Sequence, residues 1–280
     1  MKQGIVIESN KEYHGYREAI SKSGLANMSL CPQYFKWCEE NPKEPTDDLI
    51  IGSAFHKIVL EPDDFENEFI VSPTFDRRTK EGKAAYNDFV EKVEDKALRV
   101  INQEQYEMIC GMRDSILSNP YASALIKGNV EQSFYFTDDL TGEQVKARPD
   151  VWRKVQDRVA ITDLKSCKSA LPKDVAKDVV NYHYNLQDAM YRTAVNKVLG
   201  TPLENIDFVF IFVEKKPPYL LNIVVSTQAI FDSGDADFRK WIGEYHECKQ
   251  SGVWYGLNGA YGIPNELNLP KYMTEKGDKE

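Results

Sequence analysis

The sequence is poor in cysteine and has no long apolar stretch. Its five cysteines are an odd number without a C-x-x-C pair, which fits neither a disulfide framework nor a zinc ribbon. No stretch approaches the roughly 20 apolar residues of a membrane helix, and residues 1–8 lack the apolar run of a signal peptide. We therefore expect a cytoplasmic protein with reduced thiols and no membrane partner.

Basic charge is also scarce. The chain holds 35 Lys and Arg against 44 Asp and Glu, a formal net charge of −9, which excludes a uniformly basic nucleic-acid coat but not a local basic site. The phosphate-binding loop of an NTPase is absent too. Gly82-Lys83 is followed by Ala84, and Arg77 stands where that motif needs glycine.

Size and composition indicate an ordinary folded protein. The 280 residues are 42% hydrophobic and 11% aromatic, and they contain no internal repeat or low-complexity linker. We expect a single domain made of three parts. These are a mainly helical part (1–128), a sheet-containing catalytic core (129–250) and an extended C-terminal tail (251–280).

Hydrophobic periodicity predicts the elements. Helices are expected at residues 20–60, 80–95, 102–118, 172–180, 184–199 and 232–250. Strands are expected at residues 130–137, 144–153, 158–166, 206–213 and 220–226, the first three as a three-stranded meander and the last two as a hairpin. This order predicts an α+β, or mixed α/β, fold with a central mixed sheet flanked by helices.

The informative chemistry lies on the second hairpin of the meander. Asp150 ends the run Arg148-Pro149-Asp150, and Asp163 and Lys165 follow on the next strand. Asp163 and Lys165 point to the same face, and a hairpin that turns near Gln156-Asp157 brings Asp150 beside them. Two carboxylates at the edge of a sheet, with room for water, suit Mg²⁺.

These charges could instead form a solvated ion-pair face. Against that interpretation, Asp163 and Lys165 are embedded in an apolar strand, where burying a charge is costly. Residues 143–177 also hold nine Lys or Arg against five Asp or Glu, a balance of +4 that leaves −9 − 4 = −13 for the rest. A basic island around paired carboxylates suits a polyanionic substrate.

The same residues resemble a known nuclease family. Pro149-Asp150 followed by Asp163-x-Lys165 is similar to the PD-(D/E)XK signature, and Gly52-x-x-x-His56 and Gln187-x-x-x-Tyr191 resemble its RecB-like branch. Within that branch the chain resembles most the RecE type, the prophage exonuclease VIII nuclease domain. Further blocks carry this likeness: Ile20-Ser21-Lys22-Ser23, Leu60-Glu61-Pro62 and Arg77-Arg78-Thr79. The resemblance implies a restriction-endonuclease-like core.

The resemblance also implies roles for single residues. Asp150 and Asp163 would bind the metal together with His56 and the Leu164 carbonyl, and Lys165 would position or activate the attacking water. Glu131, expected on the preceding strand, would be an additional acidic group, and Gln187 and Tyr191 would face the substrate or brace the site. Taken without the resemblance, His56 would more often be a packed helix residue. The implied cofactor is Mg²⁺, with Mn²⁺ as a substitute.

DNA contacts are predicted at five basic residues: Arg77, Arg78, Lys80, Arg148 and Lys168. The cluster at 77–80 could equally be a solvated loop before a helix. Tyr182 and Tyr184 could stack on an unpaired base, although aromatic residues at a helix start more often belong to the core.

Together these features predict a Mg²⁺-dependent exodeoxyribonuclease that acts on linear double-stranded DNA ends. The resemblance alone implies 5′ to 3′ digestion, and it also implies a 3′ overhang for recombination by a RecT-like single-strand annealing partner. The net charge of −9 and the absence of an NTPase motif predict a homo-oligomer, and we expect a ring. Two alternatives remain open: another RecB-like nuclease, acting on single strands or endonucleolytically, and a non-catalytic DNA-binding module of the same fold.

Overall fold

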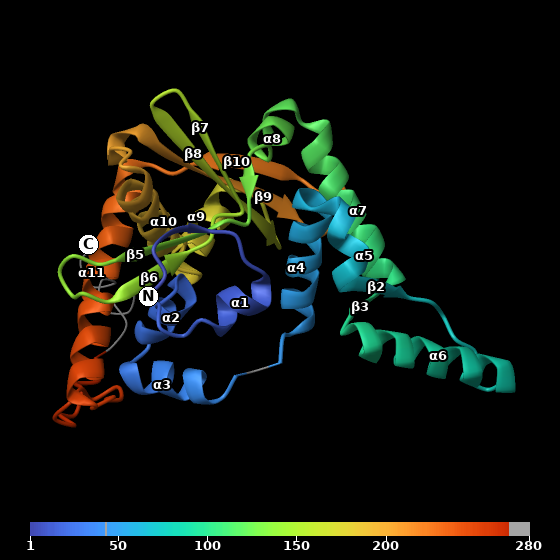
Figure 1. Cartoon of the computed structure of the whole chain (residues 1–280), viewed down its shortest axis with the longest axis horizontal. Helices are drawn as coiled ribbons and strands as arrows, with labels where there is room; N and C mark the ends of the chain where they lie inside the picture. The colour runs from blue at the N-terminus through green and yellow to red at the C-terminus, as the bar shows by residue number, and fades with distance from the viewer. Residues whose placement is uncertain (43, 269–280) are drawn as a thin grey trace, which may run out of the picture.

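The computed structural model describes residues 1–42 and 44–268 (Figure 1). Its helices are α1 (Asn10–Gly15), α2 (Lys22–Met28), α3 (Pro32–Glu40), α4 (Asp47–Leu60), α5 (Phe65–Glu68), α6 (Lys80–Lys96), α7 (Gln103–Ser118), α8 (Pro120–Leu125), α9 (Pro172–Asn181), α10 (Tyr184–Leu199) and α11 (Gln228–Ser251), with 3₁₀ turns η1 (Pro62–Asp64) and η2 (Leu203–Asn205). Its strands are β1 (Gly4–Val6), β2 (Phe69–Ser72), β3 (Arg99–Asn102), β4 (Asn129–Val130), β5 (Ser133–Thr137), β6 (Gln144–Ala147), β7 (Val151–Val155), β8 (Arg158–Cys167), β9 (Ile206–Glu214) and β10 (Leu221–Val225). The predicted mixed α/β class is confirmed.

A five-stranded mixed sheet forms the centre, in the order β10-β9-β8-β7-β4. β8 and β9 are parallel, and the other neighbours are antiparallel. Both faces of β9 are buried, as expected for a parallel strand in the middle of a sheet. Phe208, Phe210 and Phe212 pack into one core cluster, whereas Ile211 and Val213 pack into the other.

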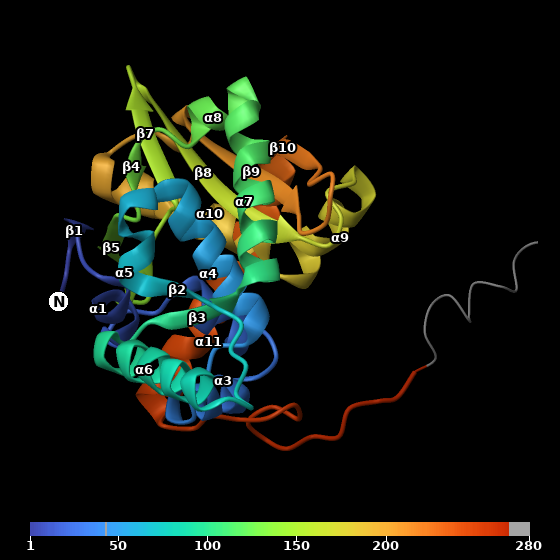
Figure 2. The same ribbon diagram turned by 90° about the vertical axis from the view of Figure 1, so that its right-hand side faces the viewer.

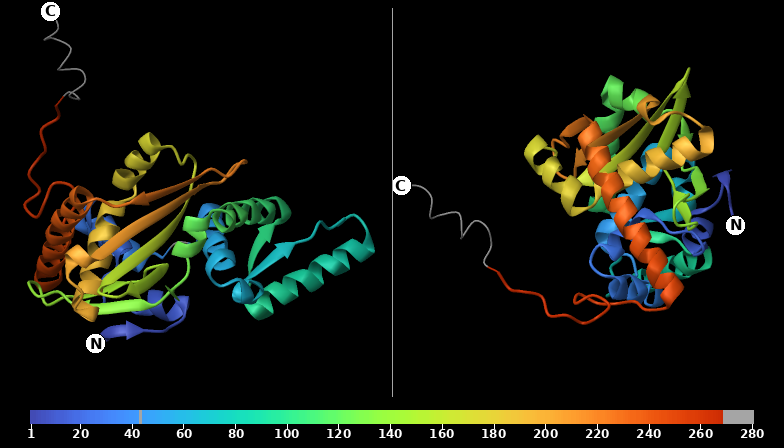
Figure 3. Two further views of the ribbon diagram at one scale, coloured as in Figure 1. Left: turned by 90° about the horizontal axis from the view of Figure 1, so that it is seen from above. Right: turned by 90° about the vertical axis from the view of Figure 1, so that its left-hand side faces the viewer.

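Helices cover both faces of this sheet. α10 and α11 lie on one side and α4 and α7 on the other (Figures 1 and 3). α4 is capped by Thr46, whose hydroxyl accepts a hydrogen bond from Leu49 N, and by Glu61, which precedes Pro62. Because α4 packs Phe55 and Ile58 into the core, His56 between them is placed on the flank of the helix.

The predicted three-stranded meander is wrong in one respect. The expected strand 144–153 is broken at Arg148-Pro149-Asp150, so that β6 pairs with β5 in a separate three-stranded sheet, β1-β5-β6, and β7 pairs with β8 in the central sheet. Pro149 has no N–H to offer a ladder, which accounts for a break at this point. Asp150 therefore lies at the junction of two sheets.

The N-terminal half also contains an arm, in which the helix predicted at 80–95 is confirmed as α6 but two short strands were not predicted. β2 and β3 form a two-stranded parallel sheet, and α6 extends from it at the far right of Figure 1. No residue of α6 is buried, although the helix has 17 residues. Residues 1–128 are thus mainly helical as predicted, with short strands added.

The C-terminal segment after α11 is extended. Its first residues pack against α3, where Trp254 stacks on Phe35 and Gln33 N donates a hydrogen bond to Tyr255 O. Residues 257–262 form turns, and the chain beyond them runs away from the body of the molecule (Figure 2). The rest of the predicted tail, 269–280, lies outside the described residues. Among the described helices, none is long and apolar enough to cross a membrane.

Candidate metal centre

A cavity of about 490 Å³ opens between α4, the end of β8 and the N-terminal segment. Its lining includes His56, Glu131, Leu164, Lys165 and Tyr184. Asp150 and Asp163 lie beside it and are 7% and 1% exposed. The structure therefore gathers predicted site residues from four separated stretches of the chain.

The predicted hairpin between the two aspartates is confirmed. Val155 pairs with Arg158, so the turn is at Gln156-Asp157. Val151 pairs with Thr162, so Asp150, just before β7, lies next to Asp163. Asp150 Oδ2 also accepts a hydrogen bond of 2.6 Å from Leu164 N. Burial opposes ionisation of Asp150, but His56, Lys165 and this hydrogen bond outweigh it and lower the pKa of the carboxyl group.

His56 reaches this pair from α4. Its Nδ1 lies 3.3 Å from Asp150 Oδ1, and its Nε2 lies 3.0 Å from Leu164 O. Burial tends to lower the pKa of His56, but the Asp150 charge overcomes it and raises the pKa to about 9. The imidazole faces the cavity and two oxygen atoms, which does not fit a histidine packed in a helix core.

A metal ion fits this donor set. One ligand atom each of His56, Glu131 and Asp150 lies within 4.8 Å of the others. Two carboxylates, a backbone carbonyl and one imidazole are mostly hard oxygen donors, which suit Mg²⁺ or Mn²⁺ better than a thiolate-binding metal.

Asp163 adds an oxygen with an unused lone pair. Within the described chain, its buried Oδ1 accepts no hydrogen bond, and Lys165 Nζ forms an ion pair with it. Its Oδ2 accepts a hydrogen bond from Gln187 Nε2. Burial and the nearby Asp150 charge raise the pKa of Asp163 to about 6. A cation at Oδ1 would satisfy this atom.

Lys165 and Gln187 form a chain of contacts with Asp163. Lys165 Nζ donates a hydrogen bond of 3.0 Å to Gln187 Oε1, while the Gln187 amide donates to Asp163. Burial opposes the charge of Lys165, but the Asp163 carboxylate outweighs it and raises the pKa of the ammonium group. The predicted proximity of Asp163, Lys165 and Gln187 is present in the structure.

Glu131 is near the site, but not on a strand as expected. It lies between β4 and β5 with a left-handed φ of 49°, and its N–H donates to Asp150 O at 3.1 Å. This conformation breaks the run predicted at 130–137 and turns the carboxyl group to the cavity. Burial and the Asp150 charge raise the pKa of Glu131 to about 8.

Tyr191 lies behind the site and does not line the cavity. It is 8% exposed, and its ring contacts Phe208 in the core cluster. Burial, together with nearby Tyr13 and the site carboxylates, raises its pKa well above the usual range. Of the two roles predicted for Tyr191, the structure places it where a bracing residue would be.

Of the five predicted DNA contacts, Arg148 lines the cavity and the other four do not. The Arg148 guanidinium turns inward, where it donates to Ser133 Oγ at 2.9 Å and to Asn10 Oδ1 at 3.2 Å and lies over Tyr13. The segment with Arg77, Arg78 and Lys80 belongs to the protruding arm (Figure 1). Lys168 is exposed just after β8.

The basic island of residues 143–177 is also dispersed. Lys146 is 5% exposed and donates to two backbone carbonyls, Tyr13 O and Tyr16 O. Arg158 pairs with Asp207 at the start of β8, away from Lys165 at its other end. A count along the sequence could not separate these inward and outward side chains.

One residue near the site, Lys22, was not predicted for it from the residue pattern. Lys22 Nζ donates to Tyr182 O at 2.6 Å and lies 5.5 Å from the centre of the Tyr184 ring. Burial and the charge of Lys165 lower the pKa of Lys22 to about 8. The only available signal was the block Ile20-Ser21-Lys22-Ser23. Tyr182, by contrast, is 57% exposed.

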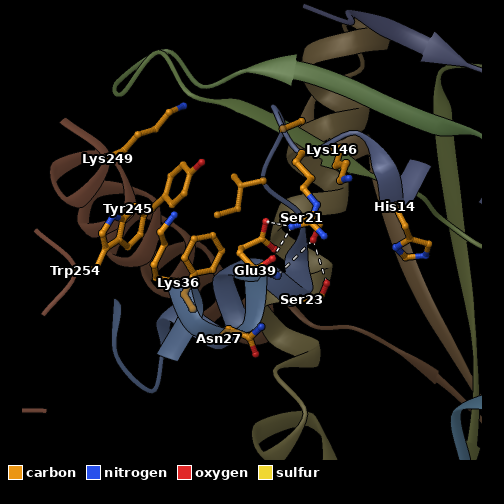
Figure 4. Close-up of a pocket in the computed structure, with 15 residues that line it drawn as sticks. His14, Ser21, Ser23, Asn27, Lys36, Glu39, Lys146, Tyr245, Lys249 and Trp254 are labelled. Carbon is orange, nitrogen blue, oxygen red and sulfur yellow. Dashed lines mark hydrogen bonds and ion pairs between the residues drawn. The ribbon is translucent and has the colours of Figure 1, made fainter. Parts of the chain in front are cut away.

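A second cavity of about 300 Å³ adjoins the first, with His14 lining both (Figure 4). Tyr245, Trp254, Lys36 and Glu39 are drawn around it. The basic side chains that line this second cavity are partly neutralised by Glu39, since the Arg17 guanidinium lies 3.6 Å from the Glu39 carboxylate.

Comparison with known proteins gives one family and one fold. A family model described as "PDDEXK-like domain of unknown function (DUF3799)" matches residues 21–260. This range includes every residue predicted to bind metal. None of the curated proteins compared with the chain matches it significantly.

Sixteen chains of solved structures match this chain in a three-dimensional comparison. A "putative exonuclease" from Eubacterium rectale is similar over 97% of this chain and 99% of its own, with a TM-score of 0.64 and 15% sequence identity. This likeness shows a shared fold. A structure of SSO0001 covers 81% of each chain with a TM-score of 0.34 and 10% identity, and we base no argument on it.

Proposed function

Because this chain belongs to the PDDEXK-like family, we propose that it is a Mg²⁺-dependent nuclease that hydrolyses phosphodiester bonds of DNA. The predicted superfamily is thereby confirmed. One observation carries the proposal. His56, Asp150 and Leu164 O, which come from α4, the sheet junction and β8, converge within hydrogen-bond or ion-pair distance, beside an Asp163 oxygen without a hydrogen bond.

The residues divide into metal ligands and a proton-bearing group. His56, Asp150, Asp163 and the Leu164 carbonyl would hold Mg²⁺, with Glu131 close by. Mg²⁺ bound there supplies charge stabilisation at the phosphate and lowers the pKa of a water molecule. Lys165 places a positive charge at the same cavity, and Gln187 holds both Lys165 and Asp163 through its two amide atoms.

The finer function follows from the resemblance to the RecE type. We propose an exonuclease that degrades linear duplex DNA from 5′ to 3′ in the cytoplasm and leaves 3′ overhangs for a RecT-like annealing partner in recombination. The fold likeness to the E. rectale protein is compatible with this activity. The complete set of site residues disfavours a non-catalytic module, whose expected mark is a missing metal carboxylate.

A ring-shaped homo-oligomer is part of this proposal. With a net charge of −9, a monomer would repel DNA over much of its surface, whereas several copies can surround the duplex with their active sites. The protein contains no NTPase motif, so continuous digestion would depend on such enclosure.

The decisive experiment uses linear duplex DNA labelled separately at each 5′ and 3′ end, with and without Mg²⁺. We expect early release of the 5′ label as mononucleotides, only with the metal. Early release of the 3′ label would reverse the polarity, and products of internal cutting would favour another RecB-like nuclease. Intact DNA with every metal and substrate would overturn the nuclease proposal.

Oligomerisation is tested by light scattering and by a trap of unlabelled DNA added after digestion starts. We expect a mass of several protomers and continued digestion of the bound molecules. A monomeric mass together with immediate arrest would contradict the ring.

A further inference from the structure

The Lys165 ammonium has a third neighbour besides Asp163 and Gln187. Its Nζ lies 4.7 Å from the centre of the Tyr184 ring. The ring lines the metal cavity and stands at the first residue of α10, which also carries Gln187 one turn later. An ammonium group at this distance from an aromatic face is attracted by the ring quadrupole.

Lys22 approaches the same ring from α2. Its Nζ lies 5.5 Å from the ring centre and is tied to the backbone by the hydrogen bond to Tyr182 O. Two ammonium groups therefore share one aromatic ring at the edge of the site. Because they repel each other, Lys22 favours positions of Lys165 that point toward the carboxylates.

The Asp163 contact cannot hold Lys165 alone during catalysis. Asp163 Oδ1, the atom that pairs with Lys165, is also the one without a hydrogen bond and a proposed metal ligand. A cation bound there would compete with the ammonium group for the same oxygen. Gln187 and Tyr184 contact Lys165 without serving as proposed metal ligands, so they can hold it in both situations.

We infer that Tyr184 is a positioning residue for Lys165, which acts through its ring face and is supported by Lys22. This inference rests on the proposed function and deepens it. Tyr184 itself need not touch the substrate. Its ring holds the ammonium group at the cavity without neutralising it, which a carboxylate partner would do.

The kinetic test compares three variants on linear duplex DNA with Mg²⁺. Tyr184→Leu removes the aromatic face and should lower kcat by about 10- to 100-fold, with KM within about twofold, since a misplaced catalytic group costs this much. Tyr184→Phe keeps the face and should retain activity. Tyr121→Leu on α8 is the control, because Tyr121 is an exposed tyrosine that does not line the metal cavity.

An independent test does not depend on cleavage. In protein with ¹³C-labelled lysine ε-carbons, the ring current of Tyr184 should shift the Lys165 signal upfield, and Lys165→Arg identifies that signal. The shift should persist in Tyr184→Phe and disappear in Tyr184→Leu, while the melting temperature stays close to that of the wild type.

The outcomes separate the two proposals. Full activity of Tyr184→Leu, or a Lys165 signal that this change leaves unmoved, would overturn the positioning role. Equal losses in Tyr184→Phe and Tyr184→Leu would also overturn it, because the hydroxyl group would then be the active part. A wild-type protein that cleaves no DNA but shows the shift would instead overturn the proposed function.

Discussion

Two clusters of buried charge lie on either side of the break at Arg148-Pro149-Asp150, and they differ in how their polar atoms are satisfied. In the N-terminal cluster (Glu8, Lys146 and Arg148), donors are matched by carbonyl, hydroxyl and amide oxygens of the protein. Around the proposed metal ligands, the Lys165 ammonium is the one partner of Asp163 Oδ1 among the described residues, and Glu131 has a pKa raised to about 8. The first arrangement stabilises the fold, whereas the second is suited to an added cation.

Asp163→Asn gives the largest expected effect and tests the cavity. Cleavage should fall by roughly three orders of magnitude or more, because effects at one catalytic constellation are large. The melting temperature should stay close to that of the wild type, since the loss of the Lys165 ion pair is offset by relief of the repulsion between Asp163 and Asp150. Nuclease rates and thermal unfolding measure both. Asp157→Asn in the hairpin turn is the control and should change neither. Marked unfolding of Asp163→Asn would place this residue with the structural cluster instead.

Arg148→Met tests the other cluster. We expect a loss of about 3 kcal/mol in the free energy of unfolding, because Glu8 and the oxygens around the guanidinium lose their partner. Urea unfolding measures it. Mn²⁺ affinity of the folded fraction should stay within about twofold of the wild type. A stable variant that binds DNA more weakly would support the predicted DNA contact of Arg148 and would contradict its structural role.

His56→Ala should weaken metal binding by on the order of 10–100-fold, and excess Mn²⁺ should restore part of the activity by mass action. Calorimetric titration with Mn²⁺ measures the affinity. Lys57→Ala, one residue along α4, is the matched control because Lys57 lines the same cavity but pairs with Glu61 and Glu68, which are not proposed metal ligands. Unchanged metal affinity in His56→Ala, together with a lower melting temperature, would show that His56 is a packed core residue and not a metal ligand.

The smallest expected effect is a pH dependence in the N-terminal cluster. Burial lowers the pKa of Lys146 to about 8, from an ordinary value of 10.5. Between these values the unfolded chain binds more protons than the folded protein, so stability should rise with pH relative to Lys146→Met. Urea unfolding of both proteins at about pH 8, 9 and 10 measures this difference. A difference that stays constant would show that Lys146 titrates normally.

Local pattern was enough to predict the hairpin that carries Asp163 and Lys165. β-formers on both sides of Gln156-Asp157 define the turn, and the alternation of strand side chains then places Asp163 and Lys165 on one face beside Asp150. The β9–β10 hairpin and helices α7, α9, α10 and α11 were predictable for the same reason. Each depends on contacts between residues close in sequence.

Long-range packing decided the rest. His56 contacts Leu164 O across 108 residues, and nothing in the periodicity of α4 indicates that contact. β6 and β7 belong to different sheets, and Arg148 between them points inward. Glu131 has a left-handed backbone conformation and therefore lies outside the predicted strand. Sequence periodicity shows which side chains share a face of an element. It does not show which distant element covers that face, and this choice made one buried charge structural and the other a candidate metal ligand.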